Sequence, residues 1–256
     1  MEKRNKAYWI IAGSILFLAG IIFLKLFLTK PEICDPNVKS KTVILIDKSE
    51  GVAKQTLSEV VNRSLELIAS DQVKEGEKVS IFDISMDSKR NLQPVFEGCK
   101  PRANGNAAIE NAKKVRRDFK KFREALEEHL SKEITGSTES PIAQAVTDIS
   151  LNHKYFVSDD ATHLVIFSDM VENTNNPKFS LYGCSSGKDA IEKYRSLKTG
   201  TMVRPKFENV KIDLNLFPRA GMSKEIVTCR DLFWAWFFGD TTCKSAECLK
   251  STYLPG

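Results

Sequence analysis

The sequence has little histidine and little excess charge, and each shortage excludes a class of function. The three histidines, His129, His153 and His163, show neither metal-ligand spacing nor the pattern of a catalytic triad. The formal net charge is +5, but residues 1–29 carry four basic groups and one acidic group, so most of the excess lies there. A domain that neutralises phosphates needs a larger basic excess, and no nucleic-acid partner is expected.

The first apolar run predicts a membrane anchor. Residues 7–28 are uncharged apart from Lys25, and as a helix they would extend roughly 33 Å, enough to cross a bilayer core. A cleaved signal peptide is the alternative, but no small-x-small site follows, and the residues before Cys34 make a poor lipoprotein box. The sequence therefore favours one transmembrane helix between a flank, 1–6, and a tether, 29–40.

The anchor's flanks and the cysteines predict which side of the membrane the rest of the chain occupies. Lys3, Arg4 and Lys6 favour a cytoplasmic N-terminus, which places the following domain on the extracytoplasmic side, periplasmic or extracellular. An even set of cysteines after an anchor is typical of an exported domain with disulfides, although six reduced buried thiols in a cytosolic domain remain an alternative. The six are Cys34, Cys99, Cys184, Cys229, Cys243 and Cys248. Their pairing is left open, and Cys243 with Cys248 lacks the second pair that a zinc site needs.

Beyond the tether, predicted strands and helices alternate. The strands are expected at 41–47, 78–85, 93–99, 162–169 and 210–217, and the helices at 53–70, 109–132, 140–151, 187–197 and 222–238. The runs 41–47 and 162–169 are continuously apolar, as in strands buried on both faces of a parallel sheet. The pattern predicts a three-layer α/β domain over 41–239, with a mostly parallel central sheet between helices, followed by a cysteine-containing tail, 240–256.

Three separate segments deliver oxygen ligands to one edge of this sheet. Asp47 and Ser49 end the first strand, Thr138 lies in the loop before a short helix, and Asp169 ends a later strand. Ligands of such sheets gather at the carboxyl ends of the strands. Carboxylates and hydroxyls without histidine or thiol suit Mg²⁺, Mn²⁺ or Ca²⁺.

These segments resemble the metal-ion-dependent adhesion site of the von Willebrand factor A (vWA) domain. That site is written Asp-x-Ser-x-Ser, then a Thr in a Gly-Gly-Thr type turn, then an Asp that closes a strand. Asp47 and Ser49 match the first segment, Thr138 the second and Asp169 the third, and the resemblance spans about 41–239. It implies a Rossmann-like fold in which the metal keeps one coordination position for a carboxylate of a partner protein.

Two residues depart from this pattern and make the predicted site degenerate. Gly51 replaces the second serine and removes a hydroxyl ligand, and Met170 stands where a glycine commonly follows the last acid. A water could replace the missing oxygen, because Mg²⁺ readily retains several waters.

The function predicted from these features is a membrane-anchored, non-enzymatic interaction module that binds a protein partner through the metal site. One alternative is a metal-free scaffold subunit of a membrane complex. A remote alternative is a Mg²⁺-dependent phosphatase with Asp47 as nucleophile, but Ser49 stands where such enzymes need a second acid.

Three further segments have an ordinary structural interpretation beside a functional one. A basic face on the helix 109–132 is a candidate partner surface, with a solvated face balanced by nearby acids as the alternative. Its residues are Lys113, Arg116, Arg117, Lys120 and Lys121. The aromatic segment 231–240 is expected to pack in the core, and 183–187 is expected to form a helix-capping turn.

Overall fold

From Cys34 onward, the described residues belong to one unit that is built around a mostly parallel sheet. The computed structural model describes residues 34–49, 51–85, 92–104, 111–132, 136–156, 160–197, 204–239 and 249–255. The predicted anchor, 7–28, lies outside these residues. Within them, no helix combines the length and apolar character needed to cross a membrane.

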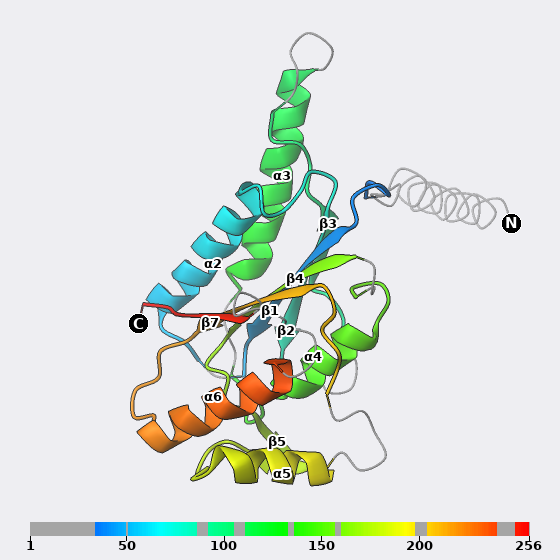
Figure 1. The fold of residues 1–256 in the computed structure, drawn as a ribbon. Helices are drawn as coiled ribbons and strands as arrows, with labels where there is room; N and C mark the ends of the chain where they lie inside the picture. Colours follow the sequence, from blue (N-terminus) through cyan, green and yellow to red (C-terminus); the bar gives the residue numbers. More distant parts are fainter. Residues whose placement is uncertain are drawn as a thin grey trace, which may run out of the picture. The chain divides into compact units, whose positions relative to one another are not determined.

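A six-stranded sheet forms the centre of this unit (Figure 1). Its strand order is β3-β2-β1-β4-β7-β8, and all neighbours are parallel except β3, which runs antiparallel to β2. The strands are β1 (Ser40–Asp47), β2 (Lys78–Ile84), β3 (Phe96–Cys99), β4 (Ala161–Ser168), β7 (Val210–Leu216) and β8 (Leu249–Tyr253). The apolar run of β1 is buried from residue 43 to 46, as expected of a central strand covered on both faces.

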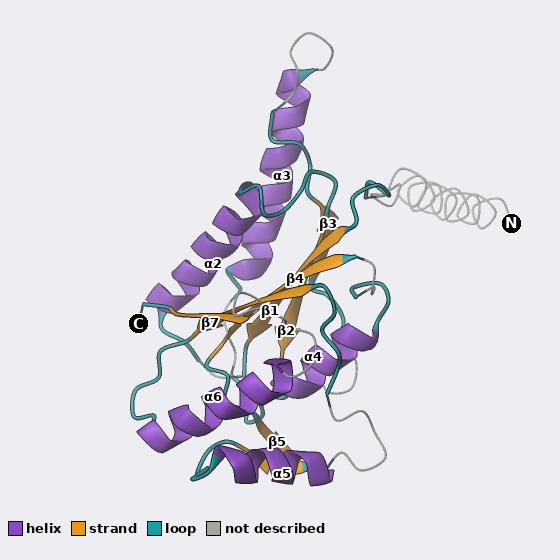
Figure 2. Ribbon diagram, in the orientation of Figure 1, coloured by secondary structure: helices purple, strands orange, loops and turns teal. Residues whose placement is uncertain are grey.

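Helices cover both faces of the sheet (Figure 2). On one face lie α2 (Lys54–Ala69) and α3 (Ala112–Leu130), and on the other lie α4 (Ile142–Leu151) and α6 (Lys224–Gly239), with α5 (Gly187–Leu197) packed against α6. Successive strand residues point to opposite faces, so Ile44 and Ile46 join the core under α2 and α3, while Val43 and Leu45 join the other core. The predicted three-layer α/β architecture is confirmed.

Strand order and register bring the carboxyl ends of β1 and β4 together. The chain moves from β1 to β2 on one side and places β4 on the other side, so the order reverses between β1 and β4. Ile46 pairs with Phe167, so Asp47 lies beside Ser168, with Asp169 next along the chain. This switch point is where open α/β sheets bind ligands.

Three strands were not expected from the sequence. The hairpin of β5 (Asn173–Asn175) and β6 (Lys178–Ser180) has strands of three residues each, too short to show a periodic pattern. The strand β8 lies within the predicted tail, 240–256, and pairs in parallel with β7 at the edge of the sheet. The sheet therefore extends beyond the predicted domain end at residue 239.

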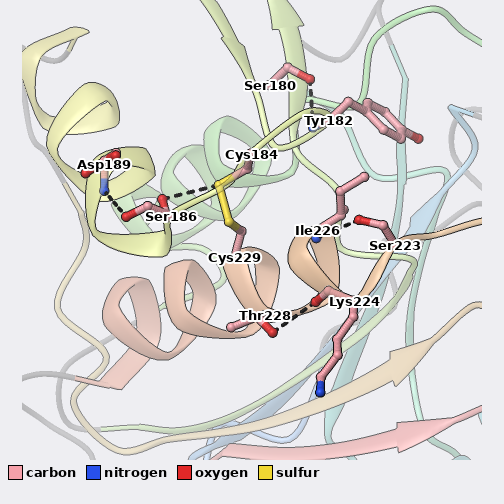
Figure 3. Close-up of a disulfide and its surroundings, with 10 residues drawn as sticks. All are labelled: Ser180, Tyr182, Cys184, Ser186, Asp189, Ser223, Lys224, Ile226, Thr228 and Cys229. Carbon is pink, nitrogen blue, oxygen red and sulfur yellow. Dashed lines mark hydrogen bonds between the residues drawn. A yellow bond between two sulfur atoms is a disulfide. The ribbon is translucent and has the colours of Figure 1, made fainter.

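Two disulfides join segments that are distant in the sequence. Cys34 pairs with Cys99 at the end of β3, and Cys184 pairs with Cys229 in α6 (Figure 3). Cys243 and Cys248 lie outside the described residues. Two pairs that the sequence left open are thus assigned.

The two segments that were interpreted as structural have those roles. The hydroxyl of Ser186 accepts a hydrogen bond from the Asp189 backbone N–H at the start of α5, so 183–187 includes the predicted capping turn (Figure 3). In α6 the aromatic residues Phe233, Trp234, Phe237 and Phe238 are buried in the core. Both segments therefore contribute to the structure as predicted.

Candidate functional site

A cavity of about 480 Å³ opens at the carboxyl edge of the sheet. The end of β1, the segment that leads into α2, the end of β4 and the loop after β7 all contribute to its walls. Its polar residues are Asp47, Ser49, Thr56, Asp169 and Arg219. The predicted edge of the sheet thus forms a cavity that contains both predicted carboxylates.

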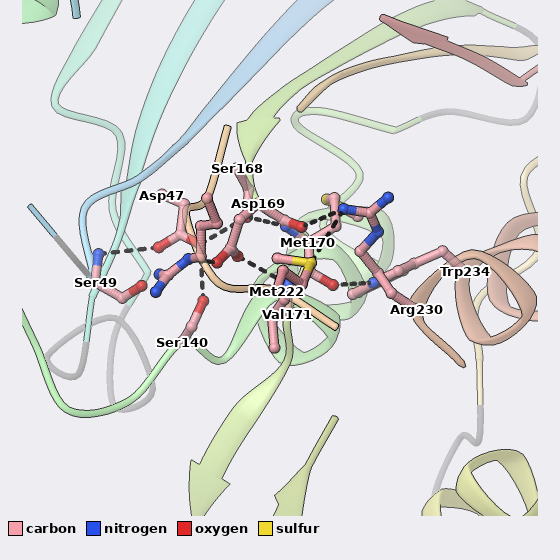
Figure 4. A network of polar contacts seen from close by, with 11 residues as sticks. Asp47, Ser49, Ser140, Ser168, Asp169, Met170, Val171, Met222, Arg230 and Trp234 are labelled. Atoms are coloured by element: carbon pink, nitrogen blue, oxygen red, sulfur yellow. Dashed lines mark hydrogen bonds and ion pairs between the residues drawn. The ribbon is translucent and has the colours of Figure 1, made fainter. Parts of the chain in front are cut away.

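Asp47 is the centre of a buried hydrogen-bond network (Figure 4). Its side chain accepts hydrogen bonds from the Ser140 hydroxyl at 2.8 Å, the Ser168 hydroxyl at 2.7 Å and the Ser49 backbone N–H at 2.9 Å. The residue is only 3% exposed, so these three donors replace water around the carboxylate. The network fixes the position of Asp47 and occupies both of its oxygens.

Asp169 forms an ion pair within the same cavity. Its Oδ1 accepts a hydrogen bond from the Val171 backbone N–H at 2.8 Å, and its Oδ2 contacts Nε of Arg219. The Asp169 side chain is almost fully buried, whereas 26% of the Arg219 side chain is exposed. Opposite charges in contact attract, so this ion pair balances one carboxylate of the site.

The turn after Asp169 has a backbone conformation that glycine would adopt easily. Met170 has a φ of 61°, in the left-handed region, which costs a non-glycine residue about 1–2 kcal/mol. Its carbonyl accepts a hydrogen bond from Nε1 of Trp234 at 2.6 Å, and the Ser168 hydroxyl accepts one from its N–H at 2.8 Å. The unusual methionine noted in the sequence is therefore held in the conformation that its position requires.

Arg230 of α6 connects this turn to the edge of the sheet. The buried guanidinium donates to the Asp169 carbonyl at 3.3 Å and to the Tyr253 hydroxyl of β8 at 2.8 Å. Burial opposes its charge, but hydrogen bonds to Tyr253 and Asp231 outweigh burial and raise the pKa of Arg230. The cation therefore stays charged while it links β4, α6 and β8.

The structure brings together three of the four predicted site residues. Asp47, Ser49 and Asp169 line the cavity, whereas Thr138 is exposed and is not among the lining residues. The Thr138 carbonyl instead accepts a hydrogen bond from the Asn173 side chain at 2.9 Å. The hydroxyl that contacts Asp47 from this loop belongs to Ser140, two residues further on.

Local structure explains why Ser140 replaces Thr138. Backbone hydrogen bonds of 2.7 and 3.1 Å join Ser140 to Asn173, and α4 starts directly afterwards with Pro141 as its N-cap. Ser140, which directly precedes this N-cap, is therefore held against the end of β1. The Ser-Pro pair before an apolar helix was the sequence signal for this position.

No sequence signal indicated Arg219. It lies in the loop between β7 and α6, and no motif places this residue opposite an acid 50 positions earlier. Only the folded arrangement of β4 and β7, which are parallel neighbours, brings the two together.

The residues present do not fit an adhesion-type metal site as they stand. Arg219 already contacts Asp169, Gly51 offers no hydroxyl and Thr138 is not among the residues that line the cavity. In the part of the chain that the structure describes, no group of three or more His, Cys, Asp or Glu side chains could hold a metal ion. A divalent cation would have to displace the guanidinium from Asp169.

The predicted basic face lies apart from this cavity. Its five residues are exposed along α3: Lys113, Arg116, Arg117, Lys120 and Lys121. Arg117 forms an ion pair with Asp118 at 3.7 Å, and Lys120 forms one with Glu124 at 3.5 Å. Such exposed pairs contribute little to stability, and this face remains a predicted partner surface.

His163 has a structural partner outside the cavity. Its Nε2 lies 2.7 Å from Oδ2 of Asp213 on the neighbouring strand β7. Burial raises the pKa of Asp213, but the hydrogen bond and charge of His163, together with Lys211, outweigh it and lower the pKa below the ordinary value. This pair belongs to the sheet and adds no catalytic histidine to the site.

Strand order and site position together define the class of the protein: a doubly wound α/β domain with a polar cavity at its switch point. No protein-family model matches the sequence. No curated protein matches it either.

Three solved structures are similar in fold. A von Willebrand factor type A protein from Catenulispora acidiphila is 10% identical, with a TM-score of 0.41, over 86% of this chain and 39% of that one. The pilus adhesin SpaC from Lactobacillus rhamnosus GG in its open conformation is 11% identical, with a TM-score of 0.49, over 86% and 28%. The manganese-loaded TRAP protein of Plasmodium vivax is 14% identical, with a TM-score of 0.39, over 87% and 70%.

The chain thus spans well under half the length of the first two structures. All three TM-scores are below 0.5, so these similarities do not establish the fold. The fold class is instead assigned from the strand order and the layers of helices described above.

Proposed function

We propose that this chain is a non-enzymatic protein-interaction module with a vWA-like fold, which binds a partner at the carboxyl edge of its sheet. The observation that carries the proposal is the cavity at the switch point, with Asp47, Ser49 and Asp169 on its walls. These residues also carry the sequence resemblance to the adhesion site. The edge of the sheet is therefore the surface on which a partner is expected.

The chemistry of the cavity supports binding over catalysis. None of the three histidines, all within the described residues, lines it. Asp47, the nucleophile of the phosphatase alternative, is buried and accepts three hydrogen bonds, which lowers its nucleophilicity and its access to a substrate.

The predicted Mg²⁺, Mn²⁺ or Ca²⁺ ion remains part of this proposal in one of its two forms. In the first form, a metal displaces Arg219 and receives an acidic side chain of the partner. In the second, the domain is a metal-free scaffold subunit of a membrane complex. The ion pair between Asp169 and Arg219 favours the second form.

We also propose an extracytoplasmic position for the domain, behind the predicted single-pass anchor at 7–28. The two disulfides support an oxidising compartment, where such bonds form and persist. A cysteine introduced at exposed Glu75 tests this orientation on intact cells, since a thiol reagent that does not cross membranes should label it only if the domain is extracytoplasmic. Absence of labelling on intact cells, with labelling after lysis, would contradict the proposal.

Site-specific photo-crosslinking tests the interaction surface. A photoreactive amino acid replaces exposed Thr138 at the carboxyl edge, and a matched control replaces exposed Glu75, in the turn before β2 at the opposite edge. The proposal expects a discrete adduct from Thr138 and none from Glu75. Equal adducts from both positions, or no adduct from Thr138, would contradict the proposal.

A further inference from the structure

The cation of the site is supplied by the chain itself. We infer that Arg219 takes the place of the divalent ion, so that the cavity receives a carboxylate of its partner without a metal. The inference rests on the proposed function, since it specifies how the same site recognises its partner.

The position of Arg219 carries the first step. Its Nε contacts Oδ2 of Asp169, the acid that closes β4 and that the sequence places among the metal ligands. Among the described residues that line the cavity, Arg219 is the only cation. Lys48, the nearest basic residue in sequence to the first acid, is instead engaged by Asp83 at 3.2 Å and by the Lys132 carbonyl at 3.3 Å.

The remaining oxygen groups are arranged for this metal-free state. Asp47 is satisfied by hydroxyl and backbone donors, so it needs no ion to balance its desolvation. Gly51 has no side chain that could bind a metal. The space beside it is open, because a Cβ atom at this position would meet nothing within 4 Å. The cavity therefore contains a cation of its own and lacks the second serine hydroxyl of an adhesion-type metal site.

The exposed side of Arg219 defines the ligand. A guanidinium is a planar fork of N–H donors that matches the geometry of a carboxylate. About a quarter of the Arg219 side chain reaches solvent at the cavity, and the first turn of α2, which carries the positive end of the helix dipole, lines the same cavity. An aspartate or glutamate side chain of a partner protein fits this combination.

The first experiment measures Mn²⁺ binding by calorimetry on the full chain in mild detergent. The wild type is expected to show no saturable binding up to about 1 mM Mn²⁺. Arg219→Gln should bind Mn²⁺ at least about tenfold more strongly, because a like charge has been removed from the cavity. Arg219→Lys keeps the charge and serves as the matched control, with no gain expected.

A second variant keeps this test decisive. Arg219→Gln combined with Gly51→Ser restores the missing hydroxyl in open space, and it should bind Mn²⁺ more strongly than Arg219→Gln alone. Wild-type binding below 1 mM that Arg219→Gln does not strengthen overturns the inference. Folded single and double variants that both fail to bind Mn²⁺ overturn it as well.

Acetate provides the probe for the carboxylate. The ¹⁵N resonance of Arg219 Nε, assigned by its loss in Arg219→Lys, should shift on titration with sodium acetate and remain in place with sodium chloride at equal ionic strength. Equal shifts with both salts overturn the carboxylate part of the inference. The photo-crosslinking result is independent of these measurements, so the interaction proposal and this inference can fail separately.

Discussion

Two serines donate to the same carboxylate, yet the structure predicts unequal costs for removing them. Ser140→Ala removes one hydrogen bond to the charged Asp47, which costs about 1.5–3 kcal/mol in the free energy of unfolding. Ser168→Ala removes a similar bond and also the acceptor for the Met170 N–H, which leaves a buried donor without that partner. The second loss adds about 1–3 kcal/mol, so Ser168→Ala should be the more damaging change.

Urea denaturation of the full chain in detergent measures these differences, with circular dichroism and tryptophan fluorescence as probes. Ser196→Ala is the matched control, because this serine is exposed and its hydroxyl donates to the Lys193 carbonyl of its own helix. Its effect should stay within about 0.5 kcal/mol. The double variant Ser140→Ala/Ser168→Ala should deviate from additivity, since both hydroxyls share Asp47. Equal costs for the two single variants, or costs no larger than that of the control, would refute this account of the network.

Three other predictions follow from contacts outside this network. The pKa of Asp213 is lowered in the folded state, so its contribution to stability is present above the ordinary aspartate pKa near 4 and is lost as pH falls through the lowered value. Asp213→Asn should therefore reduce the loss of stability in acid, measured as urea midpoints between pH 2 and 7. An unchanged pH profile would count against this role of Asp213. Trp234→Phe leaves the Met170 carbonyl without its indole donor and should cost at least about 1–3 kcal/mol, whereas a neutral result in the same denaturation assay would show that this bond does not hold the turn. Cys34→Ser removes the disulfide with Cys99, which closes a loop of 65 residues, and should lower the free energy of unfolding by about 4 kcal/mol on the chain-entropy model. A urea midpoint equal to that of the wild type under non-reducing conditions would contradict this.

The fold could be predicted from the sequence because its signals are local. Continuous apolar runs such as 41–47 mark strands buried on both faces, and amphipathic segments between them mark the covering helices. The edge strand β8 gave no such signal, because a five-residue strand at the end of a sheet has few buried positions. Its place is set by parallel pairing with β7, which is a tertiary interaction.

The site could be predicted only where a residue ends a predicted strand. Asp47 and Asp169 follow directly from the positions of β1 and β4 at the switch point. The sequence predicted Thr138 in place of Ser140, which lies two residues further along the same loop. Loop residues have no periodic pattern, and the bridge between Ser140 and Asn173 that fixes this loop joins segments distant in the sequence. Arg219 was missed because its role depends on the β4–β7 contact and on no local pattern.

The most direct test of the account is a crystal structure of the protein grown with millimolar MnCl₂, with anomalous scattering recorded for manganese. The account predicts no manganese peak at the cavity and a guanidinium of Arg219 in contact with Asp169. A manganese peak between Asp47 and Asp169, with Arg219 displaced from the carboxylate, would contradict it.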